Sequence, residues 1–96
     1  MSDPYLVSNV SFLESSPAEI RRGLLGFISC TVGGRLRLDG LTLRRSRSGR
    51  VYVAFPRPRD AWGREHVNVR PLNAVALRDI EAQIFSALGF RLETAP

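Results

Sequence analysis

The chain has 96 residues and a formal net charge of +5, all its basic residues are arginine, and 44% of its residues are hydrophobic. This length predicts a single domain over residues 1–96, with a core of about residues 5–89 and a short tail at 90–96. The single cysteine, Cys30, excludes an internal disulfide and a thiolate metal site. No apolar run is long enough to span a bilayer and no secretory signal is visible, so we expect a cytoplasmic protein.

The first part of the chain predicts two strands. Residues 5–13 read as a strand, with apolar Val10 and Phe12 on one face. A turn or loose connection follows. Residues 24–32 are apolar at nearly every position, which is typical of a central strand covered on both faces. The Gly33-Gly34 pair then predicts a two-residue hairpin turn, because glycine adopts the positive φ angles that such turns need.

A third and a fourth strand continue this antiparallel arrangement. The third begins at Arg35, and its apolar side chains change faces after Asp39 and Gly40, which favours a bulge or bend within one strand. The stretch RRSRSGR forms the next turn. The fourth strand covers residues 51–55 and ends at Pro56, because proline has no N–H to donate to a neighbouring strand.

The last part of the chain predicts a short fifth strand and one helix. Val67 and Val69 alternate before Pro71 ends the strand. The helix extends from an N-cap at Asn73 to a C-terminal stop at Gly89. Its apolar stripe comprises Leu77, Ile80, Ile84, Phe85 and Leu88. The predicted fold is α+β, an antiparallel β-meander of about five strands followed by one C-terminal amphipathic helix.

No group of residues is suited to catalysis, and we do not expect an enzyme. Cys30 lies in the apolar second strand, where a buried, inert thiol is expected. His66, the only histidine, is expected on the surface, where its functional use would be a polar contact beside arginines. Asp60 and Glu65 lie among arginines that would keep both ionised. We also expect no metal ion, cofactor or small-molecule substrate.

Positive charge is concentrated in the middle of the chain. Residues 35–70 contain ten arginines against three acidic residues, an excess of seven positive charges. Clustered positive charge is expected of a surface that binds a polyanion such as DNA or RNA. The candidate nucleic-acid-binding residues form a grip and a second patch. The grip comprises Arg57, Arg59, Arg64, His66 and Arg70, with Arg78 at its margin, and the second patch comprises Arg44, Arg45, Arg47 and Arg50.

Trp62, the single tryptophan, lies between Arg59 and Arg64 and has two interpretations. Its ring would stack on an exposed base with cation–π support from a neighbouring arginine. Alternatively, the ring folds back and packs the hairpin against the helix. We favour packing, because burying a large aromatic ring stabilises a small domain.

The order of several motifs is that of a known family. VSNVSF, GFISCTV and DGLTLRR are followed by a strand that ends in Ala-Phe-Pro and by a basic loop with a central glycine, Gly63. A short strand closing in Pro-Leu-Asn then precedes the helix. Over about residues 7–88 the chain thus resembles the septation protein SpoVG family (stage V sporulation protein G).

The SpoVG resemblance implies a small sheet with a C-terminal helix and a homodimer built by strand exchange or edge pairing. It also implies site-preferring binding of DNA or RNA, with roles in gene regulation, cell division, septum formation and sporulation. In the first helical turn this chain has only Ala74, Val75, Ala76 and Leu77, so Arg78 is the first charge on the helix. An alternative function is a protein-interaction module that recruits an acidic partner of the division or envelope machinery.

Overall fold

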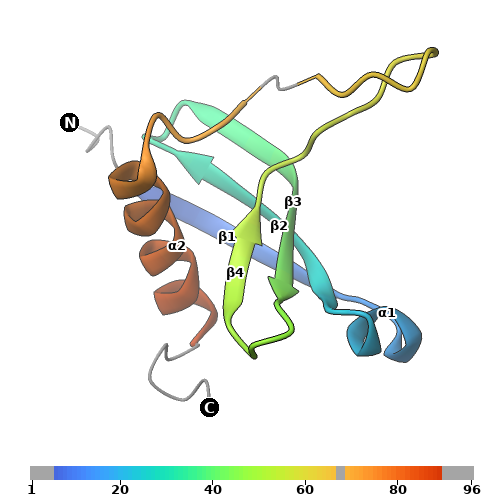
Figure 1. Ribbon diagram of the computed structural model, residues 1–96. Helices are drawn as coiled ribbons and strands as arrows, with labels where there is room; N and C mark the ends of the chain where they lie inside the picture. The colour runs from blue at the N-terminus through green and yellow to red at the C-terminus, as the bar shows by residue number, and fades with distance from the viewer. Residues whose placement is uncertain (1–5, 67–68, 90–96) are drawn as a thin grey trace.

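The computed structural model describes residues 6–66 and 69–89 and has an α+β fold (Figure 1). Four antiparallel strands form one sheet in the order β1-β2-β3-β4, with a short helix between β1 and β2 and a long helix at the C-terminal end. The elements are β1 (Val7–Glu14), α1 (Pro17–Arg21), β2 (Leu24–Val32), β3 (Leu36–Arg45), β4 (Val51–Ala54) and α2 (Ala74–Leu88). The predicted meander and C-terminal helix are therefore confirmed.

The predicted irregularity in the third strand is a β-bulge. Ile28 pairs with Leu41 and Cys30 pairs with Leu38, so β3 has one residue more than β2 between these two pairs. Gly40 has a φ of 78°, which suits glycine because it has no Cβ. Because of the extra residue, the apolar side chains before and after the bulge, Leu38 and Leu41, face the same side of the sheet although they are three positions apart. The hairpin turn before β3 includes Arg35 in addition to the glycine pair.

Only one face of the sheet is covered by the described part of the chain. Ile28, Cys30, Leu41 and Leu43 are almost fully buried on the side that holds α2. Burial raises the pKa of the Cys30 thiol. On the other side, Leu13 and Phe27 pair with each other and are 69% and 40% exposed. The expectation that β2 is covered on both faces is therefore wrong for these residues, because α1 covers only one end of the strand.

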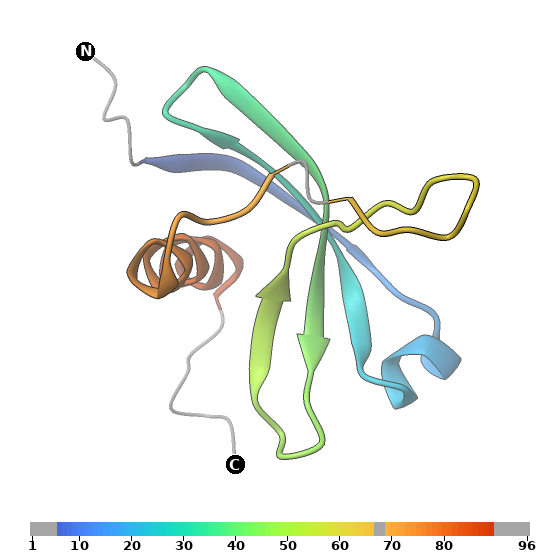
Figure 2. The same cartoon turned by 45° about the horizontal axis from the view of Figure 1, so that its top comes forward.

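Helix α2 closes the concave side of the twisted sheet and reaches both of its edges (Figure 2). Gln83 Oε1 accepts a hydrogen bond from Val7 N–H in the edge strand β1 at 2.7 Å. Glu81 Oε2 accepts one from Val53 N–H in the other edge strand, β4, at 2.9 Å. Side chains two positions apart on a helix point about 200° apart, which is why one helix serves two edges. A partner strand would pair at Val7 or Val53 only after displacing these side chains.

Helix α2 begins and ends at the residues predicted from the sequence. The Asn73 side chain accepts a hydrogen bond from Ala76 N–H, and Gly89 has the left-handed conformation with a φ of 80°. Ile84 and Phe85 are buried against the sheet. The N-cap, the C-cap and the apolar stripe are therefore confirmed.

The segment predicted as a loose connection contains helix α1. Ser16 Oγ accepts a hydrogen bond from Glu19 N–H, and Glu19 Oε1 accepts one from Ser16 N–H, which is a capping box. Pro17 occupies the first turn, where its missing N–H costs nothing. The serine, proline and glutamate spacing was a signal for this helix, and the prediction of an irregular connection was wrong.

The predicted fifth strand is not part of the described sheet. Residues 67–68 lie outside the described residues, and Val69 lies in a bend that belongs to no strand. The start of the first predicted strand at residue 5 and the tail at 90–96 also lie outside them. Within residues 6–66 and 69–89, no helix has the length and apolar character needed to cross a membrane.

Candidate nucleic-acid interface

Residues 57–66 form a narrow two-stranded arm that projects away from the sheet in both views (Figures 1 and 2). The two sides are joined by a bridge between Arg59 and Glu65. Backbone hydrogen bonds run from His66 N to Pro58 O at 2.8 Å and from Asp60 N to Arg64 O at 2.9 Å. The arm therefore has a defined shape although no core lies beneath it.

Asp60 organises the tip of the arm. Its Oδ1 accepts hydrogen bonds from the backbone N–H groups of Trp62 and Arg64 at 2.9 and 3.0 Å. Its Oδ2 lies 2.9 Å from Arg64 Nε and 2.9 Å from His66 Nε2. The hydrogen bond with His66, followed by those from the two backbone amides and Arg64, holds the pKa of Asp60 below its ordinary value despite the opposing effect of burial. The predicted ionisation of Asp60 is thereby supported.

Glu65 binds the remaining two arginines of the arm. Arg59 Nη2 lies 2.9 Å from Glu65 Oε1, and Arg59 Nη1 donates to Gly63 O at 2.8 Å. Arg57 Nη1 lies 3.9 Å from Glu65 Oε2, and its side chain is 69% exposed. Two carboxylates thus face three arginines, and the arm keeps one net positive charge when His66 is neutral. Arg57 has the longest of these contacts and is the arginine most easily released to another anion.

Trp62 is 80% exposed at the tip of the arm. The preferred interpretation, packing of this ring between hairpin and helix, is therefore wrong. Residues 57–66 project away from α2 (Figure 1), so the tip of the arm lies apart from the helix against which the ring was expected to pack. The Arg64 guanidinium lies 5.3 Å from the centre of the ring, within the range of a cation–π contact. The ring is therefore placed as the stacking interpretation requires.

The second patch lies at the opposite end of the sheet from the arm, around the turn between β3 and β4 (Figures 1 and 2). Two of its arginines donate hydrogen bonds within the chain: Arg44 Nε to Thr42 Oγ1, and Arg45 Nη2 to Ile20 O at the end of α1, both at 3.1 Å. Among the described residues, Arg47 and Arg50 have no ion-pair partner. These two are the members of the patch available to bind an anion.

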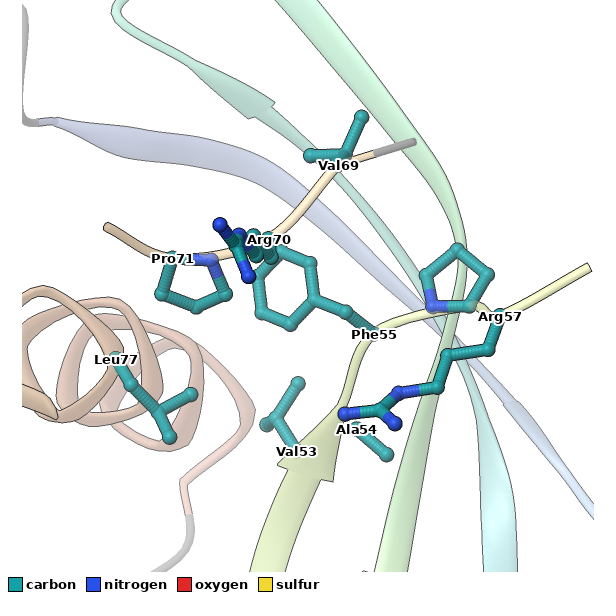
Figure 3. Close-up of a pocket in the computed structure, with 9 residues that line it drawn as sticks. Val53, Ala54, Phe55, Arg57, Val69, Arg70, Pro71 and Leu77 are labelled. Atoms are coloured by element: carbon teal, nitrogen blue, oxygen red, sulfur yellow. The ribbon is translucent and has the colours of Figure 1, made fainter. Parts of the chain in front are cut away.

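A hollow of about 250 Å³ lies between the end of β4 and the start of α2 (Figure 3). Arg57 and Arg70 contribute its charged side chains, and the rest of its lining is apolar. Arg70 and Arg78 are exposed, and neither has an ion-pair partner in the described part of the chain. The predicted grip is thus divided: Arg59, Arg64 and His66 shape the arm, whereas Arg57 and Arg70 border the hollow.

The network around Asp60 gives the arm a predictable response to acid. The pKa of Asp60 is lowered in the folded protein. Its ionised form therefore stabilises the arm fully above about pH 4, which is the ordinary pKa of an aspartate in an unfolded chain. This stabilisation is lost as the pH falls through the lowered pKa. NMR of the Trp62 amide, which donates to Asp60, would report the opening at a pH below about 4. Opening at or above that pH would contradict the assignment, and Asp60→Asn should abolish the transition.

Comparison with known proteins found no matching family model, no matching curated protein and no matching solved structure. The SpoVG resemblance therefore stays a prediction from the sequence motifs.

Proposed function

We propose that this chain is a non-enzymatic nucleic-acid-binding protein that contacts single-stranded DNA or RNA through its arm. The observation that carries this proposal is the exposed Trp62 ring on a pre-shaped arm. Arg64 lies over one side of the ring, and the 80% exposure of Trp62 leaves surface on which a base can stack. Stacking on an aromatic ring tolerates any base, because every base has a π-face.

The charged groups support the same proposal. Arg57 lies at the start of the arm, Arg70 between the arm and α2, and Arg78 within α2. Arg47 and Arg50 lie in the β3–β4 turn. Contacts between arginines and phosphates set affinity and position more than sequence choice. Regulatory roles in gene expression, septation and sporulation, and the homodimer, rest on the SpoVG resemblance alone.

Trp62 itself provides the test, because the chain contains one tryptophan and its fluorescence reports on the tip of the arm alone. Titration with an unlabelled single strand should quench this fluorescence. Anisotropy of a labelled strand should show that Trp62→Ala lowers affinity by about 5- to 150-fold, the loss of one stacked base. Because Trp62 is exposed, this substitution should leave the unfolding transition unchanged. Trp62→Phe is the matched control and should retain most of the affinity. Unchanged fluorescence at saturating strand would contradict the proposal.

The open side of the sheet favours a second candidate function. Leu13 and Phe27 form an exposed apolar pair there, which is the kind of surface that contacts another protein. A protein-interaction module that recruits an acidic partner would use this pair together with nearby arginines. Phe27→Ser should then abolish capture of the partner, whereas Trp62→Ala should not. The reverse pattern, measured with nucleic acid, supports the first function.

A further inference from the structure

We infer that the hollow between β4 and α2 holds one unpaired base of a bound strand while Arg57 and Arg70 hold the adjacent phosphate. This inference rests on the proposed nucleic-acid function and names a second contact site, separate from Trp62. It begins from the composition of the lining, which combines apolar side chains from three segments of the chain with two cationic ones.

The charges around the hollow favour an anionic ligand. Arg57 comes from the segment after β4 and Arg70 from the segment before α2, so the two approach the hollow from different parts of the chain. No carboxylate contributes to the described lining. Arg70 has no ion-pair partner in residues 6–66 and 69–89. The contact between Arg57 and Glu65 is 3.9 Å long and well exposed, so it contributes little stabilising free energy and Arg57 can turn to another anion. Figure 3 shows the Arg57 guanidinium turned towards the hollow.

The size and lining of the hollow restrict what accompanies the anion. A volume of about 250 Å³ lies just below the roughly 300–1,000 Å³ of pockets that enclose drug-sized ligands. It therefore suits a single flat ring system. Phe55, Val53 and Leu77 offer an aromatic ring and aliphatic groups for packing, but no polar group that would read base edges. A nucleotide unit joins a flat aromatic base to a phosphate, and contacts to the π-face of the base bind it without strong choice of base.

The fold explains why the hollow exists at this position. Strand β4 is paired only as far as Ala54, and the chain then leaves the sheet to form the arm. It returns at residues 69–71 and enters α2 after Asn73. The outgoing and returning segments thus stand apart at the base of the arm, and the hollow lies between them (Figure 3). A nucleic-acid strand that stacks on Trp62 and follows the arm towards the sheet would pass the hollow.

The test compares a labelled oligothymidylate with an abasic strand of equal length, using the intact protein. Ala54→Leu places a larger side chain in the lining and so fills part of the hollow. It should weaken binding of oligothymidylate by about 5- to 150-fold, the effect of one displaced base. On the abasic strand, Ala54→Leu and wild type should bind equally. The control Ala82→Leu, on the exposed side of α2, should bind both strands as wild type does.

A second variant keeps the inference testable if Ala54→Leu is unstable. Arg70 is exposed, so Arg70→Gln should fold normally. It should weaken binding of both strands and lower the salt dependence of log K by about 0.7, the value of one phosphate contact on a single strand. Equal losses from Ala54→Leu on both strands, or no loss on oligothymidylate, would overturn the inference while leaving the proposed function intact. Failure of the wild type to bind either strand would instead overturn the proposed function.

Discussion

Glu81→Ala is expected to lower the free energy of unfolding by about 2–3 kcal/mol. Glu81 is 6% exposed, and its carboxylate accepts the hydrogen bond from Val53 N–H in the edge strand β4. Alanine would leave this buried N–H without an acceptor, and it would remove the contact that joins α2 to β4. Urea denaturation followed by circular dichroism would measure the change.

Two other variants isolate the hydrogen bond from the change in charge. Glu81→Gln keeps an acceptor oxygen and should recover a large part of the lost stability. Asp79→Ala removes the same charge from the same helix, but Asp79 is exposed and has a 3.3 Å contact with Gln83. It should change stability by less than about 0.5 kcal/mol. If Glu81→Ala were as mild as Asp79→Ala, α2 would not depend on this contact with the sheet edge.

The predictions that succeeded depended on neighbouring residues. Asn73, Gly89 and the apolar stripe between them define α2 locally, through hydrogen bonds and periodicity within a few turns. The change of apolar parity at Asp39 and Gly40 likewise defines a bulge without reference to the rest of the chain. Capping residues, apolar periodicity and a change of parity can be recognised in the sequence because each depends only on residues a few positions apart.

The features that were missed depended on how the sheet curves. Glu81 and Gln83 appear in the sequence as ordinary polar residues of an amphipathic helix, and their roles at Val53 and Val7 arise only once two edges face one helix. The hollow at the base of the arm likewise depends on two segments that separate in space.

Trp62 shows a different kind of failure. Burial was expected from its size, but residues 57–66 contain no alternating apolar side chains that would bring the arm onto the core. That lack was a readable signal against packing. The arginines were expected to bind a ligand, yet Arg59 and Arg64 bind the two carboxylates of the arm. Replacing Arg57, Arg59 and Arg64 together would therefore unfold the arm as well as remove charge. Substitutions of Arg47, Arg50 and Arg70 are the cleaner test of arginine–phosphate binding.

Affinity for a nucleic acid is expected to fall by about two to three orders of magnitude between 50 and 200 mM salt if about five phosphates are bound. Among the predicted binding residues, five arginines suit this number. In the described part of the chain, Arg47, Arg50, Arg70 and Arg78 have neither an ion pair nor a side-chain hydrogen bond of their own in the structure, and Arg57 is loosely held by Glu65. Each neutralised phosphate releases counterions, so the slope of log K against log salt counts the contacts. Anisotropy titrations of labelled single strands and duplex at both salt concentrations would measure it.

The position of the second patch makes this salt response informative about the path of the strand. Arg47 and Arg50 lie at the end of the sheet opposite the arm, so a strand that touches both regions must cross the sheet. In that case Arg47→Gln combined with Arg50→Gln should reduce the slope by about 1.4–1.8, and Asp79→Asn, which removes a negative charge from α2, should not reduce it. An unchanged slope in the double variant would confine the strand to the arm and the hollow. A flat salt response in the wild type would contradict arginine–phosphate binding altogether.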